Sequence, residues 1–214
     1  MIYFIGIDPS MNSTGICVQK YDGENKVYED FIILKPVDKD KPETKWLNKK
    51  EKNAEDNLTN FRYCFYPKVD ISIYKDNNHF SEYWKSKNIS VCAKTIKDIV
   101  KEWTKDNPEQ ICIVMEGISY GSSNRTKSIF DLAGLNYLIR DKFIERPDII
   151  FTIATPSNIK KFASGNGNCN KDIIVNLFKQ THTKFDIVPK IDDISDAWFM
   201  SNYAKQLYES IDNE

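Results

Sequence analysis

The sequence contains few of the side chains that hold metal ions through sulfur or imidazole. Its 214 residues include two histidines and five cysteines, and no two cysteines are spaced as a Cys-x-x-Cys pair. The cysteines are odd in number, widely spaced and mostly set in apolar surroundings. A disulfide framework or a zinc site is therefore not expected.

Long apolar runs and an excess of one charge are missing as well. No run approaches the roughly 20 apolar residues that cross a bilayer, and the N-terminus lacks the basic region and cleavage site of a signal peptide. We therefore expect no membrane partner and a cytoplasmic location. Thirty basic and thirty-one acidic residues give a net charge of −1 at pH 7, so any DNA-binding surface has to be a local patch.

The pattern that is present is typical of an α/β protein. Apolar alternation and turn residues predict three strands joined by turns, at residues 2–7, 14–21 and 27–34. Helices and strands then alternate, at residues 92–103, 111–117, 128–145 and 149–155, with two short helices within 156–180 and a last helix at 194–210. The predicted fold is a mixed five-stranded sheet, three antiparallel strands and then parallel strands, flanked by helices.

One stretch, from about residue 36 to 88, departs from this alternation. Charged and Asn-rich segments surround "FRYCFYPKVDISIY", residues 61–74, whose alternation predicts another hairpin. Lysines and acidic residues interleave between residues 38 and 56, which favours a solvated loop over a DNA-binding arm. A sequence this polar offers little for a second core. We therefore expect a single domain over residues 1–214 with an insertion packed on its edge.

Two acidic residues stand at the carboxyl ends of apolar strands. Asp8 follows "FIGI" and Glu116 follows "ICIVM". Burying an unpaired carboxylate costs several kcal/mol, so each should be solvated, paired or bound to a cation. Ligands bind outside the strand ends of open α/β sheets, although either residue alone is more simply an acid that faces solvent.

A second pair of acids, Asp193 and Asp196, lies three residues apart at the start of a predicted helix, so both share one face. Taken alone, this pair is more simply a helix cap, because Asp is favoured in first turns. Taken together, the four carboxylates are the hard oxygen ligands that Mg²⁺ or Mn²⁺ prefers. Two such ions, about 3.5–4 Å apart, can hydrolyse a phosphodiester. Spacing alone does not show that the four groups converge.

The order of these motifs resembles that of the RuvC-type Holliday junction resolvases, which belong to the RNase H-like nuclease superfamily. The matching segments are "GIDPSMNSTG", "IVMEGISYG", "TPSNIKKFASGNGNCNK" and "DISDAWFMSNYA". They cover the first 20 residues or so and most of residues 89–207. The resemblance implies that Asp8, Glu116, Asp193 and Asp196 form a catalytic tetrad that binds two Mg²⁺ or Mn²⁺ ions.

The resemblance also implies the partners of the chain. Proteins of this family act as homodimers, largely through the helix that here spans residues 128–143, and nick two opposing strands of a four-way DNA junction. No nucleotide cofactor is expected. The candidate DNA contacts are Tyr120, Arg125, Lys127, Lys160, Lys161 and Lys171. Lysines at these positions can hold phosphates and a tyrosine can stack on an unpaired base, but a solvated lysine and a packed tyrosine are the plainer alternatives.

The chain departs from the family pattern at two places. The family connects its third strand to the next helix by a short segment, whereas this chain has the stretch 36–88. Asp192 stands beside Asp193, so a slip of one residue would make an i,i+4 pair with Asp196. The insertion and a composition of nineteen Asn against seven Ala, typical of an AT-rich genome, suggest a phage or viral member.

Two other functions are open at this point. "GIDPSMNSTG" is similar to the first phosphate loop of actin-like and sugar-kinase ATPases, although the second phosphate loop and the adenosine motif of those proteins are not visible. A module that binds branched DNA without cutting it is the other alternative. The four carboxylates argue against such a module, because a binding domain has no reason to gather repelling charges.

Overall fold

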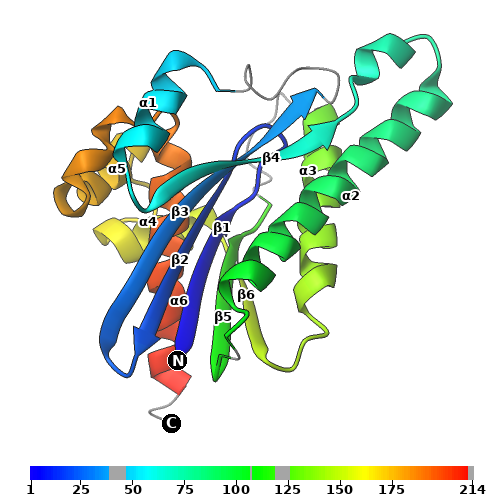
Figure 1. The fold of residues 1–214 in the computed structure, drawn as a ribbon. Coiled ribbons are helices and arrows are strands. Elements are labelled where there is room, and N and C mark those ends of the chain that lie inside the picture. The colour runs from blue at the N-terminus through cyan, green and yellow to red at the C-terminus, as the bar shows by residue number, and fades with distance from the viewer. Residues whose placement is uncertain (39–46, 107, 119–125, 212–214) are drawn as a thin grey trace.

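The computed structural model describes residues 1–38, 47–106, 108–118 and 126–211, except for the side chains of residues 126–128 (Figure 1). In this part of the chain, six strands form one sheet in the order β4-β3-β2-β1-β5-β6. Helices cover both faces of the sheet, so the predicted mixed α/β fold is confirmed. No helix in these ranges is long and apolar enough to cross a membrane.

Three antiparallel strands begin the chain, as the alternation and the turns predict. They are β1 (Ile2–Asp8), β2 (Thr14–Asp22) and β3 (Asn25–Asp38). The strand β5 (Gln110–Glu116) lies parallel to β1 on its other side, and β6 (Ile149–Ala154) lies parallel to β5. The strands β1, β5 and β6 therefore end at the same edge of the sheet.

The sixth strand comes from the insertion, where the predicted hairpin at residues 61–74 is wrong. A single strand, β4 (Phe61–Lys68), pairs in parallel with β3, and the chain then enters the 3₁₀ helix η2 (Ile71–Tyr74). The crossover between β3 and β4 carries helix α1 (Lys49–Asn57). Alternation identifies a strand but not its partner, and Asp70 turns the chain here by accepting a hydrogen bond from the Ser72 N–H at 2.9 Å. The sheet thus has six strands instead of five.

Helices cover the two faces of the sheet (Figure 1). One face carries α2 (Asn78–Trp103) and α3 (Thr126–Phe143). The other carries α4 (Pro156–Ser164), α5 (Lys171–Thr181), the 3₁₀ helix η3 (Thr183–Ile187) and α6 (Ile191–Ile211). Neighbouring residues of β1 belong to different cores, because side chains alternate across a strand. Phe4 packs in the core that contains Met200 of α6, and Ile5 in the core that contains Ile96 of α2.

Helices α2 and α6 begin at least three residues earlier than the sequence predicts. α2 begins at Asn78, within the predicted insertion, instead of at residue 92. Its first turns carry the exposed side chains of Phe80 and Tyr83, so no buried apolar stripe marks them. α6 begins at Ile191 instead of residue 194, which places Asp192 and Asp193 in its first turn.

Candidate active site

Asp8 and Glu116 end two neighbouring strands. β1 and β5 pair in parallel, with Ile7 opposite Met115, and the next residue of each strand is the acid. Both carboxylates therefore leave the sheet side by side at its carboxyl edge. The Asp8 residue is 9% exposed, and Glu116 is half-buried.

Helix α6 brings further acids to this point because it lies directly against β1 and β2. A Cβ atom added at Gly6 would collide with the backbone of Ala197, and one added at Gly15 would collide with the backbone of Asp193. Glycine permits an approach this close. Gly15 is the partner of Asp8 in the β1–β2 pair, so the first turn of α6 lies beside Asp8.

A pocket of about 260 Å³ opens beside the carboxylates. Its charged lining consists of Asp8, Glu116, Lys160, Lys171 and Asp196. Apolar side chains of the three helices α4, α5 and α6 complete the wall, namely Ile159, Ile174 and Met200. The structure thus brings three of the predicted acids and two of the predicted lysines, from five different elements, to one pocket.

Burial and neighbouring negative charges raise the pKa values of the carboxylates of the pocket. Burial raises the pKa of Asp8 well above its usual value, and the negative charges of Glu116 and Asp196 raise it further. Burial is also the main reason why the pKa values of Glu116 and Asp196 are raised. Buried like charges repel strongly, so this site needs a proton or a cation to balance them.

Lys171, the first residue of α5, supplies part of that positive charge. Its Nζ atom lies 2.9 Å from Oδ2 of Asp192 and 3.4 Å from Oδ2 of Asp196. Lys160 reaches the same pocket from α4, whereas Lys161 is exposed on that helix and lies outside the pocket lining. The two lysines that the sequence places on either side of the "SGNGN" turn thus meet at the carboxylates.

The other three predicted DNA contacts fall outside what the structure describes. Tyr120 and Arg125 lie within residues 119–125, and Lys127 lies in the first turn of α3, where its side chain is not described. Their roles stay predictions.

The neighbouring acids Asp192 and Asp193 differ in their contacts. The hydroxyl group of Ser13, in the β1–β2 turn, donates a hydrogen bond to Asp193. Burial and the neighbouring acids, Asp193 among them, raise the pKa of Asp8. Asp192 instead pairs with Lys171, whose hydrogen bond and positive charge together outweigh burial and lower the pKa of Asp192. Asp193 therefore belongs with Asp8, which favours the i,i+3 pair over the i,i+4 pair.

The donor chemistry of the site fits Mg²⁺ or Mn²⁺. Asp8, Glu116, Asp193 and Asp196 offer carboxylate oxygens, which these hard cations prefer, and their mutual repulsion favours a divalent cation among them. In the described ranges, no three Asp, Glu, His or Cys side chains stand in a ready-made ligand geometry.

Ser13 and Asn136 hold this site in place, although the sequence does not identify either residue as functional. Ser13 positions Asp193 through the hydrogen bond from its hydroxyl group. Asn136 of α3, 1% exposed, donates through Nδ2 to the backbone carbonyl of Glu116 at 2.9 Å. The sequence gives little indication of their roles, because Ser13 is typical of a turn and Asn136 is a single amide in an otherwise apolar stretch of helix.

Comparisons with known proteins identify the fold of this chain. No protein-family model and no curated protein sequence matches it. Among solved structures it is similar to RuvC of Thermus thermophilus, with a TM-score of 0.52 and 12% identity over 97% of this chain and 96% of that chain.

Two further structures are similar at a TM-score of 0.47 and 12% identity. One is T. thermophilus RuvC in complex with a Holliday junction substrate, matched over 99% of this chain and 96% of that chain. The other is the yeast mitochondrial Holliday junction resolvase, matched over 96% of this chain and 83% of that chain. The similarity with a TM-score of 0.52 and the sheet topology show that the chain has a RuvC-like, RNase H-like fold.

Proposed function

We propose that the protein is a metal-dependent endonuclease that cuts branched DNA, with the four-way junction as its main substrate. The observation that carries this proposal is the pocket in which Asp8, Glu116 and Asp196 meet Lys160 and Lys171, at the strand ends of a RuvC-like fold. Buried like charges destabilise a fold, so their collection at one point calls for a chemical reason.

In this proposal, Asp8, Glu116, Asp193 and Asp196 hold two Mg²⁺ or Mn²⁺ ions. When bound, such ions activate a water molecule and stabilise the leaving oxygen of a phosphodiester. The protein's own part is to keep the oxygen donors together despite their repulsion. Ser13 fixes Asp193, the hydrogen bond from Asn136 fixes the end of β5, and the apolar pocket wall limits access of bulk water.

The lysines bind the DNA backbone next to the metal site. Lys160 and Lys171 carry their charges into the pocket, where a scissile phosphate would neutralise them and release Lys171 from its ion pairs. Further contacts with the DNA are proposed for Tyr120, Arg125, Lys127 and Lys161. An aromatic ring beside an opened junction can stack on an unpaired base.

An exposed apolar stripe on α3 supports a homodimer. Phe130, Tyr137 and Ile144 are 78%, 61% and 70% exposed and lie seven residues apart. The first two belong to α3, and Ile144 is the residue after its end. Residues seven apart lie on one side of a helix. Large apolar side chains in such a row mark an interaction surface, and a second copy of the chain would bring two active sites to the two opposing strands of one junction.

The test is an incubation of the protein with a labelled four-way junction and with a linear duplex of the same arm sequence, in Mg²⁺ or in EDTA. The proposal predicts paired nicks at symmetric positions of the junction, with Mg²⁺ only. Equal cutting of the duplex would contradict selectivity for junctions, and cutting that persists in EDTA would contradict the metal-dependent chemistry.

A further inference from the structure

The insertion is joined to the turn that follows Asp8. The hydroxyl group of Tyr66, in β4, donates a hydrogen bond to the backbone carbonyl of Met11 at 2.9 Å. Asn88 of α2, 4% exposed, accepts from the backbone N–H of Val69 at 2.9 Å and donates to its carbonyl at 3.0 Å. Tyr66 therefore fixes the end of β4 to the turn after Asp8, and Asn88 fixes the first half of α2 to the segment that follows β4.

A groove of about 220 Å³ lies where these parts meet. Its wall includes Met11 and Asn12 of the β1–β2 turn, and its other polar groups are Lys68, Lys85, Asn88 and Asp131. Asn88 is occupied by Val69, and Asp131 is the one carboxylate of the lining against two ammonium groups. Lys85 also pairs at 2.6 Å with Glu82, whose side chain is 68% exposed, so this contact is weak in water.

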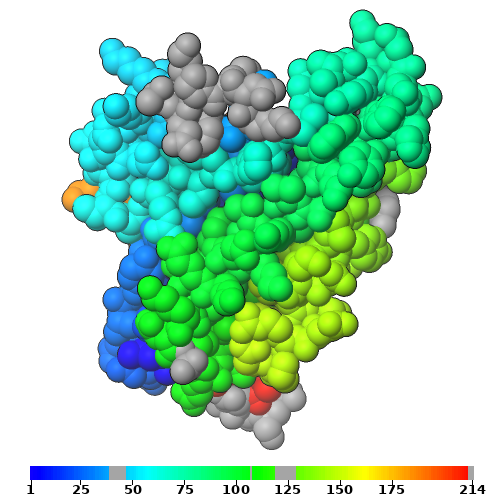
Figure 2. Space-filling view, turned by 45° about the vertical axis from the view of Figure 1, so that its right-hand side comes forward, coloured from blue at the N-terminus to red at the C-terminus, as the bar shows by residue number. Residues whose placement is uncertain are grey.

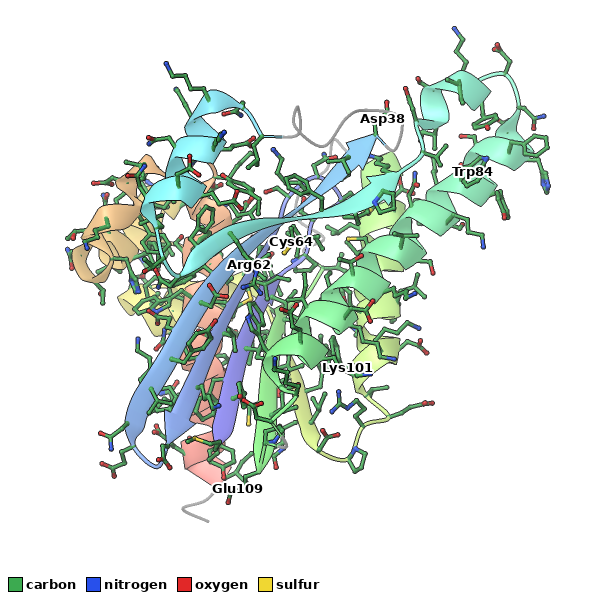
Figure 3. All side chains as sticks on the ribbon, viewed as in Figure 1. Asp38, Arg62, Cys64, Trp84, Lys101 and Glu109 are labelled. Atoms are coloured by element: carbon green, nitrogen blue, oxygen red, sulfur yellow. The ribbon has the colours of Figure 1, made fainter. Side chains whose placement is uncertain are left out.

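Beyond the groove, η2 and the first turns of α2 project from the body of the protein. Figure 3 shows Trp84 in this projection, near the end of the sheet that carries Asp38 and far from Glu109 at the opposite end. In the space-filling view, the same part rises above α3 (Figure 2). The projection therefore stands at the same end of the sheet as the active-site carboxylates, on the side that α2 and α3 cover.

The projection carries aromatic rings that the core does not cover. Phe80 and Tyr83 are 49% and 47% exposed. Tyr74 stacks on Trp84 with ring centroids 6.5 Å apart, and Nζ of Lys87 lies 5.7 Å from the centroid of the Tyr83 ring. Exposed rings interleaved with lysines are a surface on which nucleotides stack while their phosphates are neutralised.

We propose that the insertion forms a second nucleic-acid contact surface, in which Lys68 and Lys85 hold a backbone phosphate beside the β1–β2 turn and the rings of Phe80 and Tyr83 pack on the nucleotides that follow. This inference rests on the proposed function for its choice of partner. Charge complementarity favours DNA over a protein partner, because the groove lining carries two ammonium groups against one carboxylate, next to the turn that follows Asp8. The insertion thereby lengthens the path along which one arm of the junction is held.

The test measures the dissociation constant of a fluorescent four-way junction in EDTA at several salt concentrations, so that no cutting occurs. Lys68→Ala/Lys85→Ala should reduce the magnitude of the slope of log affinity against log salt by about 0.9, because the two lysines hold one phosphate and each neutralised phosphate contributes about 0.9. Phe80→Ala/Tyr83→Ala should weaken binding about tenfold with little change of slope. The matched control is Lys101→Ala/Lys105→Ala, which removes two exposed lysines, one in the last turn of α2 and one just after it. This control should leave the slope unchanged.

An unchanged slope in the Lys68/Lys85 variant overturns the proposal, as does a slope that falls equally in the control. A change of oligomeric mass in light scattering, with DNA affinity unaltered, assigns the surface to a second copy of the chain and also overturns it. The two proposals fail separately. Junction cutting with an unchanged slope contradicts only the second surface, and a reduced slope in a protein that never cuts DNA contradicts only the nuclease.

Discussion

The Nζ atom of Lys171 lies 3.4 Å from a carboxylate oxygen of Asp196, which joins the start of α5 to the acids of α6. Asp196 shares the pocket with Asp8 and Glu116, and its negative charge helps to raise both of their pKa values. A cation on a separate helix thus partly balances a cluster that the fold itself brings together. In the proposed mechanism, a DNA phosphate binds Lys171 and metal ions bind the acids, so both charges find new partners.

The adjacent acids of α6 provide a test of the ligand assignment. Asp193→Asn removes a proposed metal ligand and should lower the single-turnover cutting rate by at least about 10²-fold, because metal stabilisation is worth several kcal/mol of the barrier. Asp192→Asn, the matched neighbour, acts only through Lys171 and should cost about tenfold. If the larger loss occurs in Asp192→Asn, the i,i+4 pair holds the metal instead.

Glu29 of β3 should stabilise the fold in a pH-dependent way. Its carboxylate accepts from Lys26 Nζ at 2.7 Å and Trp198 Nε1 at 3.1 Å, and Nε2 of His182 lies 2.9 Å from it. Burial alone would raise the pKa of Glu29, but the hydrogen bonds from His182 and Lys26 outweigh it and lower the pKa from 4.5 to about 2. Since the folded state holds this proton less tightly than the unfolded state, the stabilisation is full above pH 4.5 and is lost as the pH falls through about 2.

Glu29→Gln should therefore lower the free energy of unfolding by about 2 kcal/mol at pH 7. Urea denaturation of both proteins from pH 7 to pH 2 measures the difference. The two curves should converge at the acid end, where Glu29 itself becomes protonated. Glu24→Gln, in the exposed turn before β3, is the control and should leave stability within about 0.5 kcal/mol. A constant difference at every pH would contradict the assigned role of the charge.

The stripe on α3 predicts the oligomeric state. Tyr137→Glu places a charge in the middle of the proposed interface and should convert a dimer into a monomer of 24.9 kDa in light scattering. Nicks in the two opposing strands should then occur independently instead of together. Ile211→Glu, which changes an exposed apolar residue near the end of α6, should leave the dimer intact. A wild-type protein that is already monomeric at micromolar concentration would contradict the interface.

Sequence reasoning located the strand-end acids because each follows a short apolar run, and a run of that kind predicts a buried strand whichever strands lie beside it. It did not show that Asp8 and Glu116 are neighbours, which depends on the parallel pairing of β1 with β5. The position of α6 depends on Gly6 and Gly15, which are visible in the sequence but become informative only once the helix backbone lies on them.

The insertion was harder to predict for a different reason. The alternation in residues 61–74 identified extended structure, but pairing with β3 is a long-range contact and no local turn signal specifies it. The first turns of α2 were missed because Phe80 and Tyr83 face outward, whereas the apolar period that predicts a helix comes from its buried face. Both errors concern the insertion, which we propose to contact DNA.

The substitution Asp8→Asn tests whether the buried carboxylates form a metal-dependent cutting centre. The variant keeps the shape of the side chain but removes its charge. Cutting of a labelled four-way junction in Mg²⁺ and binding of the same junction in EDTA should be measured side by side. We expect cutting to fall by about 10³-fold or more while binding is kept or strengthened, because a metal ligand is lost and a repelling charge is removed from the DNA site. Metal-dependent cutting at the wild-type rate by Asp8→Asn would contradict this expectation.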